Sequence, residues 1–151
     1  MEILRVQDDH AAGYAAAQID AGSVIIYPTD TLYGLGADAL SDSAVKLIYD
    51  VKGRDEGKPI HAIVADLLMA ERYAHLNDTA RCLAERFLPG PLTLILKKKD
   101  GIETGIAKGL DTFGIRIPDN GFCRELVEKF GGPITTTSAN RAGMMPMPTI
   151  A

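Results

Sequence analysis

The sequence has no tryptophan, only two cysteines, few aromatic residues and no long apolar run. Cys82 and Cys123 are too few for a disulfide scaffold and lack CxxC spacing, so we expect both to be reduced core residues. No segment approaches the roughly 18 apolar residues that a membrane span requires. The N-terminus shows no apolar signal-peptide region. These absences predict a soluble, cytoplasmic protein with no membrane partner.

The charge balance excludes a surface that binds nucleic acid over its whole area. The chain carries 16 basic and 20 acidic residues, a formal charge of −4, whereas nucleic-acid-binding domains are usually strongly basic. Any anion site must therefore be local. The three histidines, His10, His61 and His75, lack metal-ligand spacing, so we expect no metal held by protein ligands.

Helical patterns alternate with short apolar runs along the chain. The helical patterns cover residues 11–21, 41–51, 67–76, 78–87 and 120–130. The strand-like runs cover residues 23–27, 60–64, 92–96, 113–117 and 134–137. This interleaving predicts an α/β domain, and the non-helical connection between 96 and 113 favours a mixed parallel and antiparallel sheet. We find no repeat or linker, so residues 1–151 are expected to form a single domain.

The segment Tyr27-Pro-Thr-Asp-Thr-Leu-Tyr-Gly-Leu-Gly36 joins a buried strand to a turn rich in hydroxyls and glycine. Glycines allow a ligand to approach the backbone closely, and the hydroxyls of Thr29 and Thr31 can orient a small polar ligand. A strand-exit turn capped by hydroxyl groups explains the same residues equally well. Both interpretations stay open at this point.

The loop Lys52-Gly-Arg-Asp-Glu-Gly-Lys-Pro59 holds three cations within seven positions. Lys52, Arg54 and Lys58 could surround a triphosphate, with arginine forming bidentate hydrogen bonds and lysine acting as a point charge. Acidic neighbours in the same loop can instead neutralise them, and alone the pattern fits a solvated loop slightly better. No Walker A sequence occurs, so a bound nucleotide would need a different phosphate site.

Two further strands carry polar groups. The run Pro133-Ile-Thr-Thr-Thr-Ser-Ala-Asn140 offers neutral donors and acceptors at a strand end, although threonine also suits strands in general. Arg116 lies between two isoleucines, and strand alternation places it on the face opposite to them. If that face is enclosed, the guanidinium can bind a carboxylate; if it faces water, Arg116 is an exposed charge.

Five segments taken together resemble the YrdC-like, threonylcarbamoyl-AMP synthase family. They are YPTDTLYGLG, the K-x-R…KP loop, LPGPLTLIL, GLDTFGIRIP and TTTSAN, in consistent order from Ile25 to Asn140. The resemblance implies a twisted mixed α/β sheet around a large cleft. It also implies an enzyme that condenses L-threonine, bicarbonate and ATP into threonylcarbamoyl-adenylate and pyrophosphate, for later modification of tRNA.

The resemblance also implies roles for individual residues. The K-x-R and S-x-N signatures imply a catalytic set: Lys52, Arg54, Ser138 and Asn140. The ATP contacts it implies are Arg54, Lys58, Thr112 and Ser138. The threonine contacts it implies are Thr31, Arg116 and Thr136. Mg²⁺ would be held mainly by the ATP phosphates and water, and tRNA or tRNA-modification proteins are the expected macromolecular partners.

The sequence departs from the family pattern in two places. The family generally continues with a glycine-rich and Ser-Thr-Val segment that helps to complete both substrate sites, whereas this chain stops at Ala151. We therefore expect a C-terminally incomplete domain, in which binding is a safer prediction than turnover. Some relatives touch threonine through a polar residue after the K-x-R…KP loop, but Ile63 stands there in this chain, with His61 nearby.

Two alternative functions remain at this point. A non-catalytic RNA- or nucleotide-binding domain would use the basic loop for phosphate contacts alone. A carbamoyl-adenylate-forming domain of a carbamoyltransferase is disfavoured, because no zinc-finger or acylphosphatase-like sequence accompanies the domain in this chain.

Overall fold

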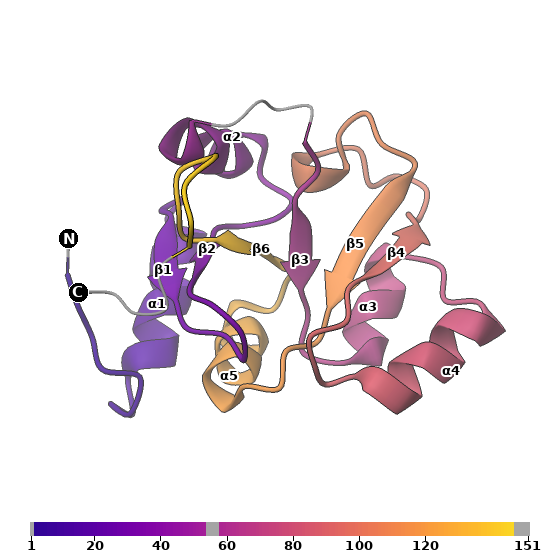
Figure 1. The fold of residues 1–151 in the computed structure, drawn as a ribbon, viewed down its shortest axis with the longest axis horizontal. Coiled ribbons are helices and arrows are strands. Elements are labelled where there is room, and N and C mark those ends of the chain that lie inside the picture. Colours follow the sequence, from indigo (N-terminus) through magenta and orange to yellow (C-terminus); the bar gives the residue numbers. More distant parts are fainter. Residues whose placement is uncertain (1, 54–57, 147–151) are drawn as a thin grey trace.

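The computed structural model describes residues 2–53 and 58–146. These residues form a six-stranded mixed sheet surrounded by helices, which confirms the predicted α/β class (Figure 1). The strands are β1 (Ile25–Tyr27), β2 (Gly34–Gly36), β3 (His61–Ile63), β4 (Leu94–Lys97), β5 (Thr112–Arg116) and β6 (Ile134–Ser138). The helices are α1 (Ala11–Asp20), α2 (Asp42–Lys52), α3 (Leu67–Tyr73), α4 (Asp78–Phe87) and α5 (Gly121–Phe130), with a 3₁₀ turn η1 (Gly105–Ala107).

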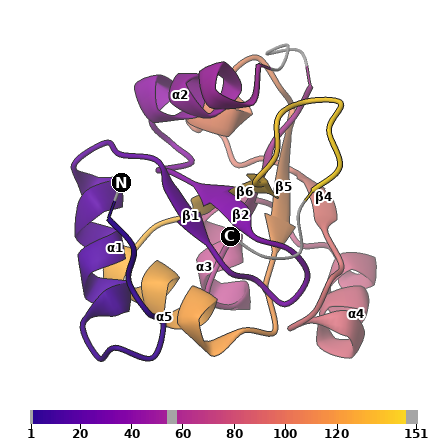
Figure 2. The same ribbon diagram turned by 60° about the vertical axis from the view of Figure 1, so that its left-hand side comes forward.

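The strand order is β1-β2-β6-β3-β5-β4. β3 and β5 are parallel, and the other neighbouring pairs are antiparallel, as expected for a mixed sheet. The last strand, β6, lies between β2 and β3, so it joins the N-terminal hairpin to the rest of the sheet. Figure 2 shows the segment after β6 returning past the end of α2, which brings the two chain regions of the predicted S-x-N and K-x-R motifs together.

Short polar side chains and glycines set the helix ends. Ser41 caps α2 by accepting a hydrogen bond from the Ala44 amide at 3.2 Å, and Asn120 caps α5 in the same way. Gly53 and Gly131 end these two helices with φ of 58° and 78°, values that favour glycine. The predicted helix boundaries of α2, α4 and α5 therefore agree with the structure to within one residue.

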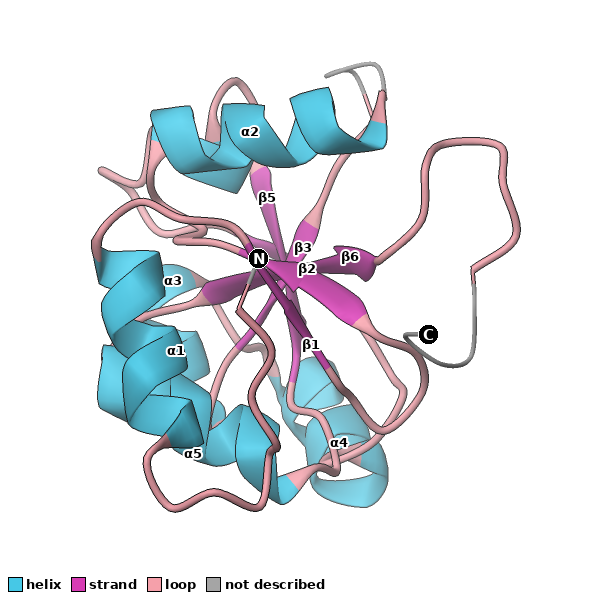
Figure 3. Cartoon of the chain, turned by 90° about the vertical axis from the view of Figure 1, so that its left-hand side faces the viewer, coloured by secondary structure: helices cyan, strands magenta, loops and turns pink. Residues whose placement is uncertain are grey.

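The two faces of the sheet pack against different helices (Figure 3). Phe113 and Ile115 of β5 belong to a core cluster with α2 and α3, whereas Ile63 of β3 and Ile134 of β6 pack with α1 and α5. This second face is incompletely covered, because Ile95, paired with Gly114, remains 64% exposed. The helices thus bury one face and leave part of the other accessible.

The structure corrects three expectations. The Gly34–Gly36 segment, interpreted as a turn, is strand β2, because its glycines leave room for the Tyr27 ring across the hairpin. A Cβ added to Gly36 would lie only 2.7 Å from Cε1 of Tyr27. The turn η1 was not predicted, and Cys82 is exposed on α4 rather than buried in the core. Among the described residues, no helix has both the length and the apolarity that crossing a membrane requires.

Candidate functional site

Four of the predicted site residues lie on one face of the sheet. Alternation puts Thr112 and Arg116 on the same side of β5, and Thr136 and Ser138 on the same side of β6. Strand β3 lies between β5 and β6, and its Ile63 pairs with Arg116 on one side and with Ile134 on the other. Paired residues share a face, and Ile134 is on the same face as Thr136, so all four predicted residues lie on one face. We call the face that carries Thr112, Arg116, Thr136 and Ser138 the site face; it is the incompletely covered one.

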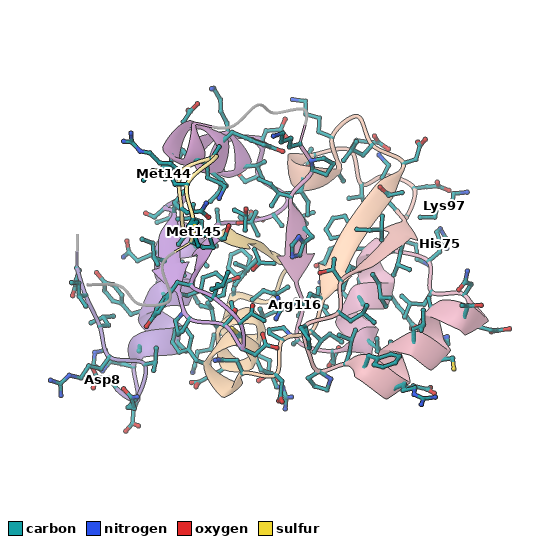
Figure 4. The ribbon with its side chains drawn as sticks, in the orientation of Figure 1. Asp8, His75, Lys97, Arg116, Met144 and Met145 are labelled. Atoms are coloured by element: carbon teal, nitrogen blue, oxygen red, sulfur yellow. The ribbon has the colours of Figure 1, made fainter. Side chains whose placement is uncertain are left out.

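Arg116 is buried and ion-paired, which answers the question that the sequence left open. Its side chain is about 10% exposed, and its Nη2 donates to Oδ1 of Asp30 at 2.5 Å. Nε donates to the Gly90 carbonyl at 3.2 Å, and both terminal nitrogens reach Oγ1 of Thr31 at 3.2–3.3 Å. Figure 4 shows Arg116 within the molecule near the end of β5, and its contacts to Asp30 and Thr31 join it to the β1–β2 loop. The Arg116 guanidinium is thus a fixed cation.

The hydroxyls of the β1–β2 loop form a directed chain. Thr29 donates its one proton to the Leu32 carbonyl at 2.7 Å, and its oxygen accepts the amide protons of Thr31 and Leu32. In the 3.1 Å contact between the two hydroxyls, Thr31 must therefore donate to Thr29. The Thr31 hydroxyl consequently accepts hydrogen bonds from Arg116. The interpretation of the loop as a hydroxyl-capped turn is therefore correct for Thr29, whereas Thr31 contacts the Arg116 guanidinium.

Lys52 is buried at the end of α2 and holds the loop after β6. Lys52 is only 4% exposed. Its Nζ donates to the Ser138 carbonyl at 2.5 Å and to the Asn140 carbonyl at 3.0 Å. The Lys52 carbonyl in turn accepts from the Ala142 amide at 2.8 Å. The solvated-loop interpretation is therefore wrong for Lys52, which joins the K-x-R and S-x-N segments directly.

Asn140 presents an unused acceptor beside this junction. Its Nδ2 donates to the carbonyls of Arg141 and Met144 at 3.0 and 2.7 Å, which closes the loop on itself. Its Oδ1 is buried and has no hydrogen-bond partner among the described residues. A buried acceptor without a partner is costly, and this oxygen is therefore an unsatisfied polar group beside the Lys52 junction.

The remaining predicted ATP contacts are less enclosed. Lys58 is exposed, and its carbonyl accepts from the Tyr49 hydroxyl at 3.0 Å, which ties the start of β3 to α2. Thr112 is exposed at the start of β5 and lines a cavity of about 760 Å³ with Lys97 and Asp111. At about 3.3 Å per residue, Thr112 and Arg116 lie about 13 Å apart along the strand. Arg54 lies outside the described residues.

The described residues contain no group of three or more His, Cys, Asp or Glu placed to hold a metal ion. Among the described residues, Arg116 and Lys97, the cross-strand partner of Thr112, are charged groups on the site face, Asp30 pairs with Arg116, and Lys52 lies nearby at the end of α2. These can bind and orient anionic ligands, and none of the described contacts supplies an activated nucleophile.

Cys123 contacts the β1–β2 loop, and its thiol is expected to be unreactive. Its Sγ donates to the Pro28 carbonyl at 3.1 Å. Burial, reinforced by the nearby Asp30 charge and opposed by Arg116, raises the pKa of the Cys123 thiol to about 12. The thiol is therefore protonated at physiological pH and unsuited to nucleophilic catalysis.

The two cysteines should consequently differ in reactivity. With iodoacetamide at pH 8, Cys82 should be alkylated at least about a hundredfold faster than Cys123, because the thiolate is the reacting form and Cys123 is also buried. Mass spectrometry of the two tryptic peptides measures the rates, and unfolding in guanidinium chloride should equalise them. Equal rates in the native protein would contradict the buried position of Cys123.

Sequence reasoning missed Asp30, the counter-ion of Arg116. It lies inside the segment that was singled out for its threonines and glycines, so its position was visible but its role was not. The available signal was Arg116 itself, because a guanidinium among isoleucines requires a paired carboxylate if it is buried. Which carboxylate pairs with it is a property of the fold.

Comparisons with known proteins find relatives that match most of this chain. The family model described as telomere recombination, covering Sua5, YciO and YrdC, matches residues 17–151. The threonylcarbamoyl-AMP synthase of Pyrococcus abyssi is 41% identical over 91% of this chain and 40% of its own length. That of Bacillus subtilis is 40% identical over 95% of this chain and 42% of its own length. This chain thus spans less than half the length of these two relatives.

Solved structures show the same fold. P. abyssi Sua5 complexed with L-threonine aligns with a TM-score of 0.85 and 37% identity, over 96% of this chain and 42% of that chain. Full-length HypF in its phosphate- and nucleotide-bound form aligns with a TM-score of 0.78 and 26% identity, over 89% of this chain and 21% of that chain. The family match over most of the sequence, together with these structures, shows that the chain belongs to the Sua5/YciO/YrdC family.

Proposed function

We propose that this domain forms L-threonylcarbamoyl-AMP and pyrophosphate from L-threonine, bicarbonate and ATP, in the service of tRNA modification. The proposal rests on two cationic side chains: Arg116, on the site face beside Thr31, and Lys52, at the end of α2 beside the Ser138–Asn140 segment. The relatives named threonylcarbamoyl-AMP synthase support the assignment.

L-threonine is proposed to bind at the Arg116 end of the site face. A buried guanidinium suits a carboxylate, and the solved relative complexed with L-threonine supports this choice of ligand. Thr136 lies on the same face, and its hydroxyl is proposed to contact the amine or hydroxyl of the substrate. Ile63, at the position where some relatives carry a polar contact, is fully buried in the core, so it supplies no such contact to threonine.

ATP is proposed to bind toward the Lys52 end. Ser138 and Asn140 supply neutral groups, Lys58 and Arg54 supply charge, and Thr112 lies at the same end of the sheet as the start of β3. The solved structure of full-length HypF, of which this chain covers 21%, is phosphate- and nucleotide-bound, and this is consistent with a nucleotide ligand. Mg²⁺ fits this site as an ion that enters with the triphosphate, coordinated by phosphate oxygens and water.

The proposed reaction needs positioning and charge rather than a protein nucleophile. The threonine nitrogen adds to the carbon of CO₂ derived from bicarbonate and loses a proton, which gives a carbamate; attack on bicarbonate itself also breaks a C–O bond and releases water. A carbamate oxygen then attacks the α-phosphorus in line, and the bond to the bridging oxygen breaks to release pyrophosphate. Arg116 would hold the threonine carboxylate and the cations near Lys52 would hold the triphosphate, so that the two anions are kept in reacting geometry and the developing charge is balanced.

A pyrophosphate-release assay tests the proposal. The protein with ATP, Mg²⁺ and bicarbonate should release pyrophosphate only when L-threonine is added, and mass spectrometry should detect the threonylcarbamoyl-adenylate. The same assay on a version extended at the C-terminus shows whether further sequence raises the rate. Threonine-independent release, or calorimetric titrations in which neither version binds threonine, would contradict the proposal.

A further inference from the structure

We propose that Asp30 is a positioning residue that orients the guanidinium of Arg116 so that one of its edges receives the substrate carboxylate. This inference rests on the proposed function, and it adds a residue that neither the predicted contacts nor the family comparison singled out. Its basis is the distribution of hydrogen bonds around the planar guanidinium.

A guanidinium offers two edges on which it can form paired hydrogen bonds here. Nε and Nη2 lie along its side, and Nη1 and Nη2 lie along its end. The side edge is taken by two strong or fixed acceptors, the Gly90 carbonyl at 3.2 Å and the Asp30 carboxylate at 2.5 Å. Among the residues that the structure describes, the end edge is taken by the neutral Thr31 hydroxyl alone, at 3.2–3.3 Å.

The two edges therefore differ in how easily a ligand can occupy them. Displacing Asp30 would separate a buried ion pair, whose two side chains are about 10% exposed, and this is costly. Displacing the Thr31 hydroxyl, an uncharged acceptor at 3.2–3.3 Å, costs less, because it separates no ion pair and the incoming carboxylate replaces the lost bonds with bonds to a charged acceptor. A substrate carboxylate is thus directed to the end edge, where Thr31 now lies.

Asp30 is itself held in place. Its second oxygen accepts the backbone amide of Asp119 at 3.2 Å, just after β5, so the carboxylate spans from the β1–β2 loop to the end of the strand that carries Arg116. The Asp30 carboxylate therefore accepts hydrogen bonds from two donors at the end of β5, Arg116 and the Asp119 amide. An asparagine in its place keeps the shape but has one acceptor oxygen for these two donors, so one of them loses its partner.

The test compares three ligands in calorimetric titrations of the full chain: L-threonine, L-threoninol, which lacks the carboxylate, and ATP. Asp30→Asn should weaken L-threonine binding by about tenfold, the effect of disturbing one charge-assisted hydrogen bond. It should change threoninol binding less than about twofold and leave ATP binding unchanged. A purely structural role would weaken threonine and threoninol equally.

Asp42→Asn is the matched control. Asp42 also accepts from one backbone amide, that of Gly105 at 2.7 Å, and from one cation, Lys108 at 2.7 Å, but it lies on α2 away from the site face. Its replacement should leave threonine affinity unchanged. Asp30→Glu, which keeps the charge but moves it by one methylene, provides a second variant if Asp30→Asn does not fold, and it should weaken threonine binding selectively as well.

Failure of the proposed function and failure of the role of Asp30 give different results. Wild-type protein that binds no L-threonine would refute the proposed function and, with it, the role of Asp30. Wild-type protein that binds threonine, with Asp30 variants that bind it equally well or lose all ligands in parallel, would overturn only the role of Asp30.

Discussion

Replacing Arg116 with methionine is expected to lower threonine-dependent pyrophosphate release at least about a hundredfold and to destabilise the fold. The substitution removes the cation at the proposed carboxylate site and leaves Asp30 buried without its partner. Breaking a buried ion pair in this way costs about 3–5 kcal/mol of unfolding free energy, a large share of the 5–15 kcal/mol typical of such domains. Urea denaturation and the pyrophosphate assay measure the two effects.

A double variant separates stability from substrate binding. Adding Asp30→Leu to Arg116→Met removes both charges, and replacing a whole buried pair by apolar groups of similar volume is often close to neutral. The double variant should therefore regain much of the lost stability and still fail to bind L-threonine. Normal threonine affinity in the double variant would show that Arg116 does not receive the carboxylate.

Replacing Lys52 with methionine is the second change with a large expected effect. The Lys52 ammonium donates to the Ser138 and Asn140 carbonyls, so its removal leaves both acceptors without a charged donor and loosens the loop. We expect a loss of about 3 kcal/mol in unfolding free energy and about a hundredfold in pyrophosphate release. Hydrogen exchange at the Ala142 amide, which donates to the Lys52 carbonyl, reports on the loop without any ligand.

Lys46→Met on the same helix is the control for Lys52→Met. Lys46 pairs with Asp50 at 3.2 Å in an exposed i,i+4 contact, with both side chains more than half exposed. Such pairs contribute about 0.3–0.5 kcal/mol, so stability, rate and Ala142 protection should change little. Unchanged Ala142 protection in ligand-free Lys52→Met would mean that Lys52 acts on the nucleotide alone and does not hold the loop.

Much of the fold was predictable, because helices and strands depend on local patterns. Apolar periodicity and the Ser41 cap located α2, and the glycine pair after Phe130 located the end of α5. Strand β2 was not predictable in this way, since three residues with two glycines carry no strand propensity. It is a strand only because β1 and β6 supply its hydrogen bonds on both sides.

For the candidate site too, some features were predictable from the sequence and others were not. The sequence by itself determined the chemistry available, namely the cations at 52 and 116 and the hydroxyl-rich segments around Thr31 and Ser138, and their order along the chain indicated the family. Only the tertiary structure decided the partners: Asp30 for Arg116, and two backbone carbonyls for Lys52. The physical reason is that these contacts join residues 86 to 88 positions apart, and local patterns carry no information about pairs that distant. A charged side chain reveals from sequence that it needs a partner when it is buried, but burial and the choice of that partner are consequences of how the sheet is assembled.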